Sequence, residues 1–120
     1  MSDIKTRTIT LTDRPPVTIR EDQWPWIAEA KWWAGGYEFQ ANRTATIRIR
    51  EHADGRRLVY GVTTSQWEGE RGLRVGRLID GRDGTPDTAE TIRAIHEVAD
   101  AIGHPALAAE CIADLPAETI

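Results

Sequence analysis

Three arginines, Arg48, Arg50 and Arg74, have the residue type and the spacing that anion binding requires. Arg48 and Arg50 alternate with Thr46 in a stretch typical of a β-strand, so we expect their side chains to point to one side. Guanidinium groups on a flat sheet bind carboxylates or phosphates through paired hydrogen bonds. The alternative explanation is an ordinary solvated sheet face, which is polar in most antiparallel proteins. The candidate binding surface comprises Arg48, Arg50 and Arg74 with Thr46, Gly61 and Thr63 between them.

Five tryptophans in 120 residues form the second unusual feature. Trp24, Trp26, Trp32 and Trp33 surround one short segment, whose apolar spacing we interpret as helical, and Trp67 lies in a loop. On a helix Trp26 and Trp33 share a face whereas Trp32 lies about 100° away, so one buried stripe cannot hold them all. We expect exposed side chains among Trp24, Trp32 and Trp67, which would anchor a protein partner or stack on bases. The alternative is that other elements of the fold cover them.

The residues capable of catalysis or metal binding are few. Cys111 occupies an apolar helical position, where a cysteine is more often a small core residue than a nucleophile. His96 and Asp100 lie four residues apart on a predicted helix, but two ligands do not complete a metal site. His52 and His104 have ordinary positions before a turn and at a helix start. Because no phosphate loop, CxxC pair or nucleophile elbow is present either, we expect no enzyme activity, cofactor or metal.

The hairpin predicted at residues 44–64 positions the arginines. Two alternating apolar stretches flank Asp54-Gly55, a dipeptide that favours a two-residue turn. That turn would pair Ile49 with Tyr60, Ile47 with Val62, and Arg48 with Gly61. Apolar residues would then meet beneath the helices while the arginines face water.

The remaining elements complete an α+β domain. We predict a strand at residues 5–11, a helix at 22–34 that Gly35-Gly36 ends, and a third meander strand at 73–79. Thr85-Pro86 begins a helix that Gly103 ends, and His104-Pro105 begins a shorter one. The predicted order is β-α-β-β-β-α-α, an antiparallel sheet of three to four strands with helices packed on one face and the other face open to solvent. The inward positions are Leu73, Val75 and Ile79 of the third strand, Ile92, Ile95, Val98 and Ile102 of the first closing helix, and Leu107, Cys111, Ile112 and Leu115 of the last.

Length and composition bear on the number of domains, the cellular compartment and the charge of a partner. A chain of 120 residues with 40% apolar residues is the right size for a single domain, residues 1–120. No apolar run approaches the roughly 20 residues of a membrane span, the polar start is unlike a secretory signal, and a lone cysteine fits a reducing compartment. We therefore expect a cytoplasmic protein without membrane contact. Residues 43–82 carry nine basic and five acidic side chains whereas residues 83–120 carry one and eight, so a charged partner would be steered to one face.

Two family resemblances bear on function. The α-β-β-β-α order resembles a double-stranded RNA-binding domain, but Asp87 and Glu90 stand where such domains begin their last helix with basic residues, so we reject that assignment. Segments across most of the chain resemble a family of small uncharacterised proteins encoded on proteobacterial plasmids and integrative conjugative elements. That resemblance implies a cytoplasmic accessory factor of a mobile element and transfers no site residue. It rests on residues 23–25, 37–43, 53–56, 59–62, 67–71 and 110–116.

Three hypotheses follow from these features. The leading one is a non-catalytic interaction protein that binds a protein partner through exposed tryptophans and the arginine-bearing sheet face. The second is a weak nucleic-acid-binding protein that uses the same face. The third is a small enzyme with a pocket beside the predicted first helix, to which Tyr37, His52 or Cys111 would contribute. The proposed contact residues of the first two hypotheses are Arg48, Arg50, Arg74, Trp67, Trp32 and Trp24.

Overall fold

The computed structural model describes residues 4–34, 42–67 and 69–118, which form two antiparallel sheets and two α-helices. In chain order the elements are β1 (Thr6–Ile9), β2 (Val17–Arg20), the 3-10 turn η1 (Glu21–Gln23), β3 (Trp26–Ala34), β4 (Arg43–Glu51), β5 (Arg57–Ser65), β6 (Arg74–Ile79), α1 (Thr88–Ala101) and α2 (Leu107–Ala113). β1 and β2 pair as a hairpin, and β3 to β6 form a four-stranded sheet in sequence order. The predicted α+β class, the antiparallel sheet and the helices on one of its faces are confirmed.

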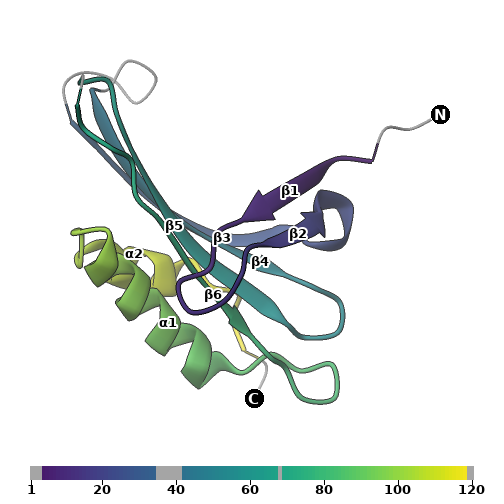
Figure 1. Cartoon of the computed structure of the whole chain (residues 1–120). Coiled ribbons are helices and arrows are strands. Elements are labelled where there is room, and N and C mark those ends of the chain that lie inside the picture. The colour runs from purple at the N-terminus through teal and green to yellow at the C-terminus, as the bar shows by residue number, and fades with distance from the viewer. Residues whose placement is uncertain (1–3, 35–41, 68, 119–120) are drawn as a thin grey trace.

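The four-stranded sheet is covered on both faces by different elements. Figure 1 shows α1 and α2 on one face, called here the helix face, and the β1–β2 hairpin crossing the other, called here the hairpin face. The predicted solvent-open second face is therefore wrong for the part that the hairpin covers. Residues that are directly opposite each other on neighbouring antiparallel strands share a face of the sheet. The pairing register therefore shows which side chains lie on the helix face and which on the hairpin face.

The larger core lies between the helix face and the helices. Ile47, Ile49 and Val59 are fully buried there against Ile95 and Val98 of α1. Burying an aliphatic side chain of this size contributes roughly 1.5–3 kcal/mol to stability, so these contacts hold the helical layer in place. Small side chains on β3 and β4 complete this core, namely Ala28, Ala30 and Ala45.

A second, smaller core lies under the hairpin. Leu58 and Tyr60 of β5 are buried there beneath Ile9, Ile19 and Trp24, the last of which follows η1. Both faces of β5 are therefore apolar, and the first five residues of the strand are all buried. The hairpin acts as a second covering layer, which replaces the solvent expected on this face.

The helix predicted at residues 22–34 is wrong, because this segment forms strand β3. Ala28 and Ala30 point into the core while Glu29 and Lys31 point the other way, which is the alternation of a strand. A bulge interrupts the pairing between Trp26 and Ala28. Tertiary pairing with β4 outweighs the helix propensity of the alanines. The Gly35-Gly36 stop predicted for that helix lies outside the described residues.

The predicted hairpin exists, but its register differs by one residue. Ile49 pairs with Val59 and Arg48 pairs with Tyr60, because the turn contains three residues, 53–55, instead of two. The amide of His52 donates to the carbonyl oxygen of Arg56 at 2.9 Å, which closes this longer turn. A shift of one residue moves every side chain of a strand to the other face. Leu58, Tyr60 and Val62 consequently lie on the hairpin face, and Gly61 and Thr63 lie on the helix face.

The Asp-Gly turn is packed against a second turn of similar sequence. Gly55 has a φ of +94°, and a Cβ there would meet the carbonyl carbon of Gly84 at 2.8 Å. A Cβ on Gly81 would in turn meet the backbone of Gly55 at 2.7 Å. The two Asp-Gly-Arg segments therefore touch through their glycines, and neither position has room for a side chain.

The last strand and both closing helices agree with the sequence in most details. Val75 and Ile79 of β6 pack on the helix-face core as predicted, whereas Leu73 precedes the strand and is exposed. The N-cap of α1 is Asp87, whose carboxylate accepts from the amide of Glu90 at 3.1 Å, two residues later than predicted. Gly103 follows α1 with a φ of +77°, as a helix-ending glycine should. No helix in the described ranges is both long enough and apolar enough to cross a membrane.

The observed register predicts a stability defect for Gly61→Val. A Cβ at this position would lie 2.7 Å from Cγ1 of Val98 and 3.2 Å from Cγ2 of Ile102, so α1 must move away from the sheet. Overpacking of this kind lowers the free energy of unfolding by about 1–3 kcal/mol. Urea denaturation measures the loss. Thr46→Val, an isosteric change on the hairpin face of the neighbouring strand, is the control and should change stability by less than about 0.5 kcal/mol.

Candidate functional site

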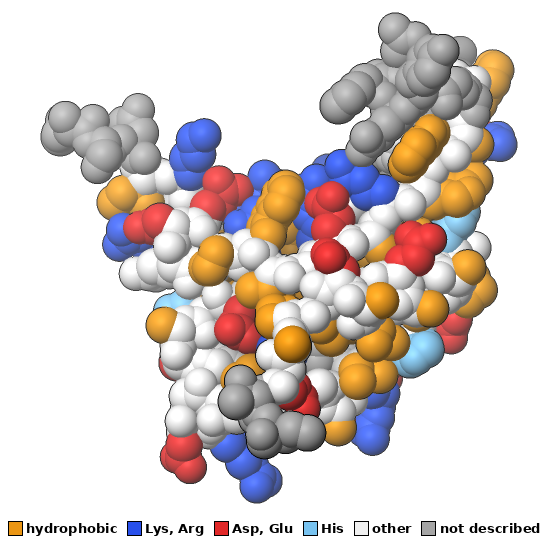
Figure 2. All heavy atoms as spheres, turned by 180° about the vertical axis from the view of Figure 1, so that it is seen from behind, with side chains coloured by type: hydrophobic (Ala, Val, Ile, Leu, Met, Phe, Trp, Pro, Cys, Tyr) orange, Lys and Arg blue, Asp and Glu red, His pale blue; other side chains and the backbone are white. Residues whose placement is uncertain are grey.

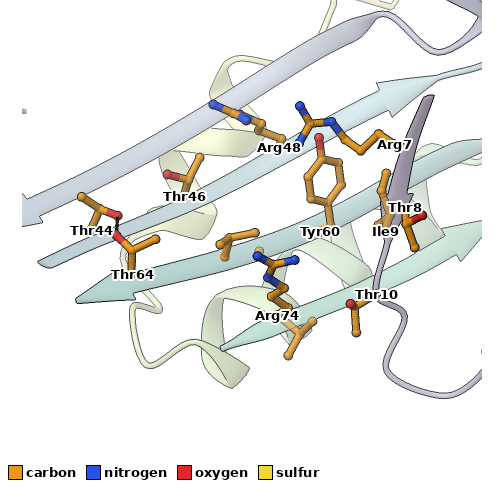
Figure 3. A pocket seen from close by; sticks show the side chains of 13 residues that line it. Arg7, Thr8, Ile9, Thr10, Thr44, Thr46, Arg48, Tyr60, Thr64 and Arg74 are labelled. Carbon is orange, nitrogen blue, oxygen red and sulfur yellow. Dashed lines mark hydrogen bonds between the residues drawn. The ribbon is translucent and has the colours of Figure 1, made fainter. Parts of the chain in front are cut away.

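A groove of about 280 Å³ lies on the hairpin face, between β1 and the part of the sheet that the hairpin leaves uncovered. Figure 3 shows Arg7 entering it from β1, Arg48 from β4, and Arg74 from β6. Ile9 and Val62 supply its apolar part. Its polar lining consists of arginine, threonine and tyrosine, and no described lining residue is acidic. The groove therefore presents hydrogen-bond donors and positive charge to a ligand.

Carboxylates just outside the groove hold two of its three guanidinium groups. Arg7 Nε donates to Glu21 Oε1 at 2.7 Å, and Arg48 Nε donates to Glu29 Oε2 at the same distance. Among the described residues the side chain of Arg74 has no ion pair or hydrogen bond, and it is exposed. Arg74 is consequently the groove arginine whose positive charge is not already compensated.

Arg50 does not belong to the exposed surface, although the sequence placed it there. Its side chain is buried beneath the hairpin, with a relative exposure of 3%. Its Nε donates to the Tyr60 hydroxyl at 2.9 Å, and Nη1 donates to the carbonyl oxygen of Trp24 at 3.0 Å. Its Nη2 also lies 3.6 Å from the Glu21 carboxylate. Arg50 is a structural residue that joins the hairpin segment to the sheet.

The indole of Trp26 extends the same network at the edge of the sheet. The guanidinium carbon of Arg48 lies 4.1 Å from its ring centroid, and that of Arg50 lies 5.4 Å away. Cations at this distance are attracted to the negative face of the ring. Trp26 is nevertheless half exposed, and Figure 2 shows hydrophobic, basic and acidic side chains together in a broad hollow on this side of the molecule. This mixed surface continues the groove toward β3.

Exposed large apolar side chains gather at one end of the four-stranded sheet, called here the distal end. β3 ends there and β4 begins there, while the connection from β5 to β6 lies beside them (Figure 1). Trp33 lies on the hairpin face opposite Thr44, and Trp32 lies on the helix face opposite Ala45. The exposed side chains of the distal end are Trp32, Trp33, Trp67 and Leu73, with relative exposures of 36%, 44%, 54% and 47%.

The tryptophan expectations are thus partly met. Trp32 and Trp67 are exposed as predicted, but Trp24 is buried in the hairpin core at 6% exposure. Its ring contacts His52, with centroids 5.1 Å apart, and the guanidinium of Arg56 lies over it at 5.2 Å. Sequence reasoning missed Trp33 and Arg7. Strand alternation from Ala28 onward would have revealed Trp33, and the Thr-Arg-Thr pattern at the chain start would have revealed Arg7.

The catalytic candidates are not brought together. Cys111 lies in the helix-face core, where burial together with the Asp114 and Glu29 carboxylates raises the pKa of its thiol to about 12. A thiol with that pKa stays protonated at neutral pH and is a poor nucleophile. His52 lies on the other side of the sheet beside Trp24. Tyr37 is outside the described residues, and strand β3 occupies the place of the helix beside which the enzyme pocket was predicted.

A metal centre is not formed by the part of the chain that the structure describes. No three His, Cys, Asp or Glu side chains in these ranges are grouped so that they could hold an ion. The predicted His96 and Asp100 pair lies on the exposed side of α1. Comparison with known protein families, curated proteins and solved structures finds no match to this chain. The resemblance to a mobile-element family stays a prediction, and the function must be argued from the site itself.

The buried position of Arg50 predicts that Arg50→Leu destabilises the fold. The substitution leaves the Tyr60 hydroxyl and the Trp24 carbonyl without their donor, which lowers the free energy of unfolding by roughly 1–3 kcal/mol. Arg74→Leu is the matched control, because Arg74 is exposed and should change stability by less than about 0.5 kcal/mol. Chemical denaturation of both variants measures the two changes in the free energy of unfolding. Equal losses would show that Arg50 is not a structural arginine.

Acid should weaken the distal end through Glu70. Hydrogen bonds from Arg43 and then Ser65 lower the pKa of the Glu70 carboxyl from 4.5 to about 2. Because the folded pKa is lowered, this stabilisation is complete above about pH 5 and disappears as the pH falls toward 2. Glu70→Gln should have a lower Tm than the wild type at pH 7 and a smaller further fall between pH 5 and pH 2. Differential scanning calorimetry measures both.

Glu118→Gln provides the control for this titration. Glu118 is exposed near the chain end, and among the described residues its carboxylate makes no ion pair. This variant should keep the acid sensitivity of the wild type. An unchanged slope in Glu70→Gln would contradict the proposed contribution of the Arg43–Glu70 pair.

Proposed function

We propose that this chain is a non-catalytic binding protein that docks a protein partner on the distal end of its sheet and the adjoining groove. The observation that carries this proposal is the concentration of exposed tryptophans at the distal end, where Trp33 and Trp67 are about half exposed and Trp32 is partly covered by His104, with ring centroids 4.3 Å apart. β3, β4 and β5 continue past the helices on one side and past the hairpin on the other (Figure 1). The Cα radius of gyration of 14.8 Å exceeds the roughly 13.6 Å typical of a compact domain of this length, in keeping with a projecting element.

The energetics of exposed tryptophan support an interface. A tryptophan side chain buries about 150–250 Å² when it is covered, and tryptophan is among the residues most enriched at the centres of protein interfaces. Trp32, Trp33 and Trp67 together could thus contribute on the order of half of the roughly 800 Å² that each partner buries in a standard interface. Solvent-exposed placement of all three at one end of a small domain is therefore best explained by a partner that covers them.

The groove would supply specificity to this interface. Trp33 lies opposite Thr44, and Thr44 lies opposite Thr64, so the distal end and the groove form one continuous surface on the hairpin face. Arg48 and Arg74 lie farther along the same face. An apolar anchor beside directed hydrogen-bond donors is the usual arrangement of a selective interface. Of the residues predicted from the sequence, Arg48, Arg74, Trp32 and Trp67 keep their proposed binding role.

Nucleic-acid binding is the second candidate, because no acidic residue is among the described lining residues of the groove, and such a lining favours an anionic ligand. Affinity for a phosphate backbone grows with the number of phosphates that are neutralised. Arg7 and Arg48 already pair with Glu21 and Glu29, which leaves Arg74 as the uncompensated groove arginine. The Glu21 and Glu29 carboxylates beside the groove would also repel a phosphate backbone, so a protein partner is the better proposal.

The biological setting is also a proposal. The resemblance to small proteins of plasmids and integrative conjugative elements supports an accessory role for this chain during the life of a mobile element. Such a role requires capture of another protein and no chemistry by this chain. The cytoplasm would be the compartment of that encounter.

Site-specific photocrosslinking tests the proposed docking surface. A photoreactive phenylalanine analogue replaces Trp33 at the distal end, and the same analogue replaces Arg93 on the exposed side of α1 as the control. Illumination in lysate of the source cells should give a discrete adduct from position 33 and none from position 93. Treatment of the adduct with protease and nuclease identifies the class of partner.

The outcomes of this experiment separate the hypotheses. A protease-sensitive adduct specific to position 33 supports the protein partner. A nuclease-sensitive adduct at position 33 would contradict the protein partner and support nucleic-acid binding at the distal end. Equal labelling at both positions, or none at either, would contradict a docking surface at the distal end.

A further inference from the structure

The groove beside β1 points to the chemistry of the partner segment. We propose that it binds one carboxylate of an extended acidic segment of the partner, with Arg74 as the principal contact and Arg48 and the threonine hydroxyls as supporting donors. This inference rests on the protein-docking function proposed above and specifies what is recognised. Figure 3 shows Arg74 and Arg48 on opposite sides of the pocket, with Thr44, Thr46 and Thr64 along it.

The character of the lining favours an anionic acceptor. Guanidinium groups donate only, and threonine hydroxyls are able to donate, so the groove can satisfy several acceptor atoms on one ligand. Thr46 and Thr10 have no side-chain hydrogen bond to another described residue, and their hydroxyls remain available. A carboxylate has two oxygens with about four acceptor positions, which such a set of donors can fill.

The carboxylates beside the groove bear on the choice between a carboxylate ligand and a more highly charged one. Glu21 accepts from Arg7 and also lies 3.6 Å from Arg50, and Glu29 accepts from Arg48 and also lies 3.4 Å from Lys31. Arg74 is the groove arginine that no carboxylate of the described residues contacts. A carboxylate with one negative charge is repelled less by Glu21 and Glu29 than a phosphate monoester, which carries about −1.5 to −2 charges.

The register fixes the distance between the anion site and the apolar anchor. Arg74 pairs with Val62 on β5, which pairs with Thr46 on β4. Trp33 lies one strand beyond β4 and two residues farther along the face, opposite Thr44. With strands about 4.8 Å apart and about 3.4 Å per residue, Arg74 and Trp33 are separated by roughly 16 Å.

An extended peptide spans that separation in about five residues. The segment should therefore carry an acidic side chain and, about five positions away, a large apolar side chain that contacts Trp33. This spacing is the distinguishing feature of the proposal, because neither a free carboxylate nor a mononucleotide can reach both positions at once. The groove lining reaches Thr44, which lies opposite Trp33, so such a segment can contact both positions on one face.

Selection from peptide libraries tests this inference. Two libraries of octapeptides are random at every position except the second, which is glutamate in one library and glutamine in the other. Passed over the immobilised full chain, the glutamate library should be retained at least 10-fold more. The retained sequences should show apolar residues concentrated at about the seventh position.

Matched variants assign the effect to the groove. Arg74→Gln should abolish the preference for glutamate, whereas Arg93→Gln should keep it, since Arg93 is also exposed but lies on α1, across the sheet from the groove. Circular dichroism confirms that both variants are folded. A preference that survives Arg74→Gln, or equal retention of both libraries by the wild type, would overturn the inference.

Two competing ligands are tested in the same format. An oligothymidine octamer or inorganic phosphate that displaces the retained peptides at lower concentration than the free glutamate peptide would overturn the acidic-peptide assignment. The docking function is judged separately, because the crosslink from position 33 does not depend on the acidic residue. A crosslinked protein partner without any glutamate preference would refute this inference and leave the proposed function standing.

Discussion

The guanidinium of Arg50 is the interaction on which the arrangement of the hairpin face depends. It joins the sheet to the segment that follows β2, because it bonds to Tyr60 on β5 and to the backbone of Trp24, and it lies beside Glu21 of η1. A buried cation is tolerated only when its donors are satisfied and a counter-charge lies close, and both conditions are met here. The position of the hairpin is therefore specific, and with it the extent of sheet that is left uncovered as the groove.

The sequence allowed the fold class, the meander of β4 to β6 and both helices to be predicted, since each has one apolar face with a clear period. It failed at β3, where Trp26, Ile27, Ala30 and Trp33 satisfy helical spacing as well as Ala28 and Ala30 satisfy strand alternation. Local periodicity cannot separate the two patterns in a nine-residue segment. The segment is a strand because it pairs with β4, and a local sequence pattern does not show a pairing between residues that are distant in the chain.

Only part of the candidate site could be predicted, because its surface also depends on contacts between segments that are distant in the chain. Arg48 and Arg74 lie on the face that was expected, because alternation within a single strand does not depend on its partner. Arg50 has the same alternation, but the hairpin buries it, and nothing in a local pattern shows which half of a face a distant hairpin will cover. The faces of β5 could not be assigned either, since apolar residues line both of its sides and a one-residue change in turn length exchanges them.

Trp32 and Trp33 are neighbours in β3, and neighbouring residues of a strand point in opposite directions. β3 is also the outermost strand of its sheet. A flat partner surface can cover one indole but not both. A partner that buries both indoles must contact both faces of the sheet around the edge strand β3. Its own recognition surface must then be a cleft. A partner that covers only the Trp33 indole leaves Trp32 on the opposite face, where it packs against His104.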